Sequence, residues 1–136
     1  GLAPMTGWGG AMRIAVCEQN PAQRDQLCSW IWQVCSLYGL EPELAAYGAP
    51  QELLDALRLR RFEIILLSAD GPEGFLAVRQ LRERDRQAQI IFLTDTNRYM
   101  VMGVRLHLAD YVVKPLEFQK ISRSLKLCGI GVGGWG

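Results

Sequence analysis

The segment FEIILLSADGPEG, residues 62–74, carries the two signals that decide the fold. Its apolar run from Ile64 to Leu67 has no polar position, which is typical of a strand buried on both faces of a parallel sheet. The run ends at Ser68, where the chain turns polar and enters a glycine-containing loop. In open parallel sheets the residues at such strand ends often carry the function. Ser68 is therefore the first candidate functional position.

Four further apolar runs flank this segment, and stretches with helical periodicity separate them. The expected strands and helices cover, in turn, 12–17, 21–38, 42–47, 50–60, 62–68, 73–85, 88–94, 97–107, 110–113 and 115–128. Asn20 followed by Pro21 favours a helix start, and Gly39 fits the end of that helix. Alternation at this spacing favours a doubly wound parallel sheet with helices on both faces. Five such units predict an α/β, flavodoxin-like fold with strand order 2-1-3-4-5 and five helices.

Composition and charge limit the function classes. The chain has 136 residues, of which 49% are apolar and 21% charged, and its net charge is +1. These values fit one ordinary globular domain and give no electrostatic reason to expect direct nucleic-acid binding. We interpret the arginines of 58–61 and those at 79, 82, 84 and 86 as solvated helix faces balanced by nearby acids. No apolar stretch approaches the roughly 20 residues of a membrane span.

The cysteines at 17, 28, 35 and 128 form no CxxC pair, and a single histidine argues against a Cys/His zinc site. Unpaired cysteines indicate a reducing compartment, and the first eleven residues lack signal-peptide character. We therefore expect a cytoplasmic protein. Residues 1–11 and 129–136 together hold nine of the fourteen glycines. We interpret both as linker or expression-derived tails and expect the domain at 12–128.

The sequence at the strand ends resembles a CheY-like response-regulator receiver domain. The motifs that carry the resemblance occur in the right order and are IAVCEQN (14–20), FEIILLSADGPEG (62–74), IIFLT (90–94) and ADYVVKP (109–115). KPLEF (114–118) and CEQNPAQR (17–24) are most similar to the receivers of LytTR-type transcription regulators. The resemblance covers 12–128 and implies a non-enzymatic part in two-component, phosphorelay signal transduction.

In that family two acids after the first strand and an aspartate at the end of the third strand hold Mg²⁺, and the aspartate takes a phosphoryl group. Family positions that this chain keeps are Glu18, Thr94, Lys114 and the switch aromatic Tyr111. Gln19 stands where the second acid belongs, and Ser68 stands where the phosphoacceptor aspartate belongs. The resemblance therefore assigns the pocket but leaves its chemistry incomplete.

The two departures have chemical consequences. Mg²⁺ prefers anionic oxygen ligands, and an amide and a hydroxyl remove two of three negative charges from the site. A serine hydroxyl cannot form an acyl phosphate. We therefore predict a degenerate receiver, or pseudo-receiver, that needs no cofactor or metal and acts by protein–protein interaction. Ser68 is expected to hydrogen-bond to its neighbours in a pocket where Glu18 faces Lys114.

Three alternatives concern the chemistry at this strand end. Asp70 lies two residues beyond Ser68, so a bent loop could turn its carboxylate toward Lys114 and make it a working phosphoacceptor with Glu18 and Mg²⁺. Otherwise Asp70 is a solvated loop residue. A hydrolytic role for Ser68 is disfavoured, because the chain has no G-x-S-x-G motif and His107 is expected to cap the far end of a helix. A flavin site would rest on the fold alone.

The stretch NRYMVMGVRLHL (97–108) is apolar nearly all round, which is typical of a buried helix or an interface. Its candidate interface residues are Tyr99, Met100, Val101, Val104 and Leu108. The family resemblance implies pairing through helix four, strand five and helix five, either as a homodimer or with a partner protein. It also implies a DNA-binding output domain outside this chain. A well-buried helix is the alternative.

Overall fold

The structure is a computed structural model, and it describes residues 11–132. In chain order the elements are β1 (Arg13–Cys17), α1 (Pro21–Leu37), β2 (Glu43–Tyr47), α2 (Pro50–Ala56), β3 (Ile64–Ser68), α3 (Gly71–Arg84), β4 (Gln89–Thr94), α4 (Met100–Arg105), β5 (Asp110–Val113) and α5 (Phe118–Leu127). The strands form one parallel sheet in the order β2-β1-β3-β4-β5. The expected fold class and strand order are confirmed.

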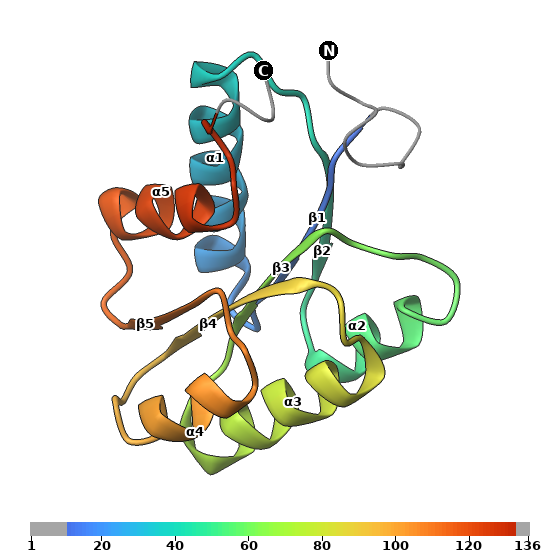
Figure 1. The fold of residues 1–136 in the computed structure, drawn as a ribbon, viewed down its shortest axis with the longest axis vertical. Coiled ribbons are helices and arrows are strands. Elements are labelled where there is room, and N and C mark those ends of the chain that lie inside the picture. Colours follow the sequence, from blue (N-terminus) through green and yellow to red (C-terminus); the bar gives the residue numbers. More distant parts are fainter. Residues whose placement is uncertain (1–10, 133–136) are drawn as a thin grey trace.

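Helices cover both faces of the sheet. Figure 1 shows α1 and α5 together on one face and α2, α3 and α4 on the other. Because side chains alternate along a strand, each central strand feeds two cores. In β3, Ile64 and Leu66 pack toward α1 and α5, whereas Ile65 and Leu67 pack toward the other three helices. All four side chains are buried, as the uninterrupted apolar run predicts.

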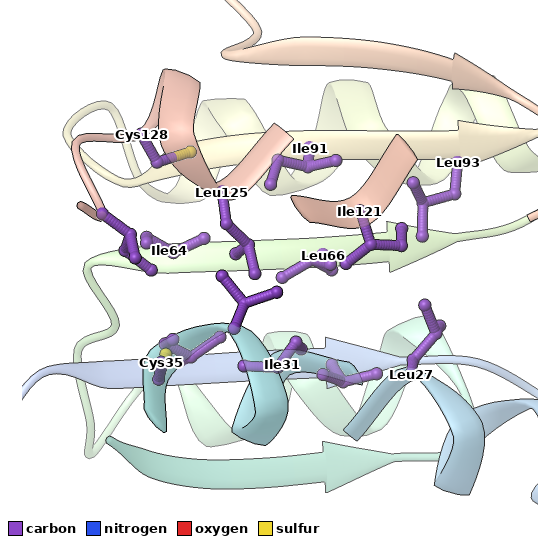
Figure 2. Close-up of a cluster of buried hydrophobic side chains, with 14 of the residues drawn as sticks. Leu27, Ile31, Cys35, Ile64, Leu66, Ile91, Leu93, Ile121, Leu125 and Cys128 are labelled. Atoms are coloured by element: carbon purple, nitrogen blue, oxygen red, sulfur yellow. The ribbon is translucent and has the colours of Figure 1, made fainter. Parts of the chain in front are cut away.

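The core under α1 and α5 is built from helical residues one turn apart. Leu27 and Ile31 come from α1, and Ile121 and Leu125 come from α5 (Figure 2). None of these four side chains has exposed surface. Residues four positions apart lie on the same side of a helix, so each pair forms an apolar stripe that faces the sheet.

The ends of two helices follow the expected local chemistry. The Asn20 side chain accepts a hydrogen bond from the Gln23 amide at 2.9 Å, and Pro21 occupies the first turn of α1. His107 has a φ of 54°, and its amide donates to the Val104 carbonyl at 3.0 Å. Leu108 then donates to the Gly103 carbonyl at 3.5 Å. His107 therefore ends α4 in a left-handed conformation, which confirms its predicted capping role.

Several expected boundaries are wrong. The helix expected over 97–107 is limited to Met100–Arg105, and the helix expected from Pro115 begins at Phe118, after a cis Lys114–Pro115 bond. The second helix ends at Ala56 and not at 60. The shorter α4 leaves residues 95–99 in the loop between β4 and α4, beside the strand ends that form the site.

Packing continues past the expected carboxyl-terminal boundary at Cys128. Ile130 has no exposed surface and belongs to the core under α1 and α5. Gly131 has a φ of 85°, and a Cβ there would lie 2.7 Å from the Tyr38 ring. The remaining tail residues, 1–10 and 133–136, lie outside the described residues. Over the described range, no helix has the length and apolar character that a membrane crossing requires.

Candidate functional site

Strand ends on one edge of the sheet bring the candidate residues together. The ends of β1, β3, β4 and β5 carry Glu18, Ser68, Thr94 and Lys114, in that order, at or next to the last residue of each strand. The carboxyl ends of parallel strands meet at one edge of the sheet, so residues far apart in the chain become neighbours. The residues that the sequence assigns to the pocket therefore lie at the same edge of the sheet.

Ser68 is hydrogen-bonded to Glu18, the acidic residue that directly follows β1. Its Oγ donates to Glu18 Oε1 at 2.5 Å, and the Asn20 amide donates to Glu18 Oε2 at 2.7 Å. Each of Glu18 and Ser68 is only 5% exposed. Both carboxylate oxygens of Glu18 are therefore engaged, and the Ser68 hydroxyl serves as a donor within the pocket.

Lys114 lies between two carboxylates. Its Nζ is 2.9 Å from Asp70 Oδ1 and 3.9 Å from Glu18 Oε1. The Lys114 side chain is 17% exposed and that of Glu18 is 7% exposed, whereas the Asp70 side chain is 51% exposed. The ammonium group is therefore neutralised from the interior by Glu18 and from the solvent side by Asp70.

Asp70 reaches Lys114 because it does not cap its own helix. It occupies the N-cap position of α3, but its side chain makes no capping hydrogen bond. The amide of Gly71, the first residue of α3, donates instead to Asp95 Oδ1 at 3.3 Å. The bent-loop alternative therefore describes the position of Asp70 better than the solvated-loop alternative, although half of its surface stays exposed.

Two neighbours complete the pocket. Thr94 is fully buried, and its hydroxyl lies 3.5 Å from Asp95 Oδ1. Gln19, which the sequence placed in the pocket, lies at its rim: the residue is exposed, and its carbonyl accepts from Arg24 Nη1 at 3.4 Å. Sequence reasoning did not single out Asp95. Its position directly after the end of β4 was the available signal.

Tyr111 points inward from β5 and is tied to the loop after β4. Its hydroxyl donates to the Thr96 carbonyl at 2.6 Å and accepts from the Tyr99 amide at 3.4 Å. Its ring meets Phe92 edge-on at 5.4 Å, and burial raises the pKa of its hydroxyl. Tyr111 therefore connects the 96–99 stretch, next to the pocket, with the strand that precedes Lys114.

The residues of this pocket do not fit a divalent cation in the arrangement observed. Glu18 accepts two hydrogen bonds, and the ammonium of Lys114 occupies the space between Glu18 and Asp70. Among residues 11–132 no group of three or more His, Cys, Asp or Glu side chains is placed to hold a metal ion. A cation would have to displace Lys114 and break the bond from Ser68.

A hydrolytic site at Ser68 is not supported either. His107 is the single histidine of the chain and ends α4. Its carbonyl accepts from Arg82 of α3 near the amino ends of the strands, at the edge of the sheet opposite Ser68. Ser68 donates to a carboxylate and has no imidazole beside it that could take its proton.

The outer face of α4 is apolar and open to solvent. The exposed fractions are 44% for Met100, 76% for Val101, 44% for Met102 and 74% for Val104. The alternative of a well-buried helix is therefore wrong, since Gly103 is the one buried residue of α4.

The two remaining candidates for this interface face the core. Tyr99 stacks on Phe75, with ring centres 4.7 Å apart, and Leu108 is half-buried in the same core. Tyr99 and Leu108 are therefore withdrawn from the candidate interface, which keeps Met100, Val101 and Val104.

Curated proteins that resemble this chain in sequence include two bacterial regulatory and sensory proteins. No family model matches the chain. The positive alginate biosynthesis regulatory protein of Pseudomonas aeruginosa is 24% identical over 117 residues, which are 85% of this chain and 46% of that protein. Sensory transduction protein LytR of Staphylococcus epidermidis is 22% identical over 84% of this chain and 44% of its own length. The chain thus spans just under half the length of these curated relatives.

Solved structures match over nearly the whole chain. The non-phosphorylated HemR receiver domain of Leptospira biflexa has a TM-score of 0.72 at 18% identity, covering 89% of this chain and 95% of that one. The chemotaxis response regulator CheY4 of Vibrio cholerae has a TM-score of 0.70 at 16% identity, covering 87% and 98%. The response regulator TrrA of Thermotoga maritima, in complex with Mg²⁺ and beryllium fluoride, has a TM-score of 0.69 at 22% identity, covering 86% and 98%. The chain has the fold of response-regulator receiver domains.

Proposed function

We propose that this chain is the receiver domain of a LytTR-like transcription regulator and that it acts through protein–protein contacts without phosphorylation at Ser68. The observation that carries the proposal is the closed set of bonds at the strand ends. Ser68 donates to Glu18, and Lys114 lies between Glu18 and Asp70. The names of the curated relatives, which are regulatory and sensory transduction proteins, support the signalling role.

The physical basis is that the pocket already contains its own counter-ions. Lys114 and Glu18 form an ion pair. A phosphoryl group or a metal ion would have to break this pair in order to bind. Closed in this way, the pocket holds the ends of β1, β3 and β5 in one arrangement. The proposed role is therefore a fixed, non-enzymatic receiver that positions other parts of the regulator, including an output domain that binds DNA.

The proposed contact surface is the outer face of α4, defined by Met100, Val101, Met102 and Val104. An exposed apolar cluster of this kind is typical of protein interaction sites, and methionine side chains adapt to the surface they meet. A second copy of the chain is the proposed partner. Sedimentation of wild type should show concentration-dependent self-association, and Val104→Glu should abolish it. Leu37→Glu, at a position that is 72% exposed on α1 and lies outside α4, β5 and α5, is the matched control.

A working phosphoacceptor at Asp70 is the second candidate, and one observation favours it. The Asp70 carboxylate is half exposed and lies 2.9 Å from the Lys114 ammonium. The nucleophile would be a carboxylate oxygen of Asp70, which would displace the leaving group of a small phosphodonor and form an acyl phosphate.

Exposure to acetyl phosphate and Mg²⁺, followed by intact-mass measurement, tests both candidates. We expect an unchanged mass for wild type and for Asp70→Asn. We expect Ser68→Asp, which restores the missing carboxylate, to gain the mass of one phosphoryl group or to bind beryllium fluoride. A labelled wild type whose label disappears in Asp70→Asn would establish the second candidate and overturn the first.

A cytoplasmic location completes the proposal. All four cysteines are free thiols, which fits a reducing compartment. Burial raises the pKa of Cys17 and of Cys128 to about 12, so these thiols stay protonated at neutral pH. The cysteines therefore suit a structural role in the two cores.

A further inference from the structure

The opposite edge of the sheet, at the amino ends of the strands, carries a hollow that the proposed function does not use. It lies where the segment after α2 meets the end of α3, two regions that Figure 1 shows side by side. The hollow has a volume of about 330 Å³, and its lining includes Leu57, Arg60, Arg61, Arg84, Asp85 and Arg86. Four of these six side chains are guanidinium groups.

The side chains that line the hollow carry an excess of positive charge. Four guanidinium groups and one carboxylate give its lining a net charge of +3, whereas the whole chain carries +1. The one carboxylate is engaged elsewhere, because Asp85 Oδ1 accepts from the amides of Gln87 at 2.8 Å and Ala88 at 2.9 Å. Within the described range, no carboxylate lies within ion-pair distance of Arg60, Arg84 or Arg86.

Three of the guanidinium groups are held in place by the protein. Arg61 donates to the Gln87 side chain, and Arg84 Nη1 donates to the Leu54 carbonyl at 3.3 Å. The Arg60 guanidinium lies 5.6 Å from the centre of the Phe62 ring. A guanidinium has five N–H donors, so the single bond of Arg84 leaves most of its donors for a ligand. Holding these groups in advance lowers the entropy cost of binding an anion.

Compensation of helix dipoles explains only part of this cluster. Arg82 and Arg84 lie in the last turn of α3, where a cation is favourable. Arg82 makes four hydrogen bonds there, because it donates to the carbonyls of Leu106, Asp85, Ala88 and His107. Arg60 and Arg86 lie in loops beyond the helices. Among the described residues neither side chain donates a hydrogen bond, and Arg60 contacts the Phe62 ring.

We propose that this hollow binds a small anion that carries two or more phosphate groups. Guanidinium groups pair with phosphate oxygens through two parallel hydrogen bonds, and several of them together match a group with several negative charges. The volume lies at the lower end of the range for small-molecule sites and is far too small for a nucleic-acid duplex. The site is independent of the pocket at Ser68.

Titration with inorganic diphosphate, followed by calorimetry, tests the proposal on the full chain. Wild type should bind at one site, and the double variant Arg60→Gln/Arg86→Gln should bind at least about tenfold more weakly, because it loses two sets of charge-assisted hydrogen bonds. The control Arg58→Gln/Arg79→Gln removes the same charge from exposed arginines outside the hollow and should change the affinity by less than about twofold.

Three outcomes would overturn the proposal. They are no binding of diphosphate by wild type, equal weakening in the two double variants, and tighter binding of a poly-glutamate peptide or a DNA duplex than of diphosphate. If the double variant does not fold, as judged by circular dichroism, amide NMR of wild type decides instead. Shifts of Gln87 and Ala88 on addition of diphosphate would support the site, and their absence would refute it.

Discussion

The two edges of this sheet differ in how many carboxylates accompany their positively charged side chains. At the carboxyl edge one ammonium, on Lys114, has two carboxylates beside it, on Glu18 and Asp70. At the amino edge four guanidinium groups line a hollow whose one carboxylate, on Asp85, accepts from backbone amides. The first edge is neutralised from within, and the second keeps an excess of positive charge at the surface.

Under the two proposals, this difference gives the edges separate roles: the carboxyl edge holds strand ends together, and the amino edge binds an anion. Ser68 brings no charge to the carboxyl edge, where Glu18 and Asp70 pair with Lys114. The arginines that line the hollow lie outside the two cores, so we expect them to add little to the stability of the fold. If the comparison holds, charge removal at the first edge should destabilise the protein, whereas at the second edge it should mainly weaken binding.

The largest effect is expected for Lys114→Met. The change leaves Glu18 buried and without its cation, which should lower the free energy of unfolding by about 3 kcal/mol. Urea denaturation followed by tryptophan fluorescence measures it. Adding Glu18→Gln should restore part of the loss, because the uncompensated charge is then absent. A loss below about 1 kcal/mol for Lys114→Met would contradict the idea of an edge neutralised from within.

Arg82→Met is expected to have the second largest effect, and it separates a structural arginine of the amino edge from the arginines of the hollow. Arg82 differs from its neighbours because it donates to four carbonyl groups, those of Leu106, Asp85, Ala88 and His107. Its loss should cost about 2 kcal/mol in the same urea experiment. The control Arg86→Met removes an exposed arginine of the hollow and should stay within about 0.5 kcal/mol of wild type. Equal costs for both variants would mean that the hollow is part of the structural framework.

The carboxyl edge was far more predictable from the sequence than the amino edge, for a physical reason. Each strand end is visible as the point where an apolar run turns polar, so the order of the strands was enough to place Glu18, Ser68 and Lys114 together. The arginines were interpreted as solvated helix faces balanced by acids. Arg82 corrects this, since burial lowers its pKa and carbonyl groups surround it. Arg60 lies in a loop, and a sequence does not show which loops meet.

The start of α4 and the orientation of its apolar side chains were less predictable than its helical character. Its apolar periodicity predicted a long helix over 97–107, but the tertiary contacts of Tyr99 take precedence over local preference at its start. The Tyr99 ring stacks on Phe75 and its amide donates to Tyr111, so the helix begins at Met100. Apolar side chains were correctly identified there, yet their number could not show which of them would face solvent.

His107→Gly tests the boundary of α4 next to the amino edge. The left-handed φ of 54° is unfavourable for histidine, so glycine should raise the free energy of unfolding by about 1 kcal/mol. Thermal unfolding by circular dichroism measures the gain. Arg79→Gly, at an exposed position inside α3, is the control and should lose a similar amount. A destabilised His107→Gly would show that the imidazole makes a contact that outweighs the backbone strain.

The smallest effect is expected for Asp70→Asn, and it decides which acid neutralises Lys114. The Asp70 side chain is 51% exposed, so its ion pair is screened by water even at 2.9 Å. Removing its charge should cost about 0.5 kcal/mol in urea denaturation and should cost nothing further in a Lys114→Met background. A loss above about 2 kcal/mol would reverse the assignment, with Asp70 as the main counter-ion. The carboxyl edge would then depend on a surface carboxylate and would be open to any ligand that competes for it.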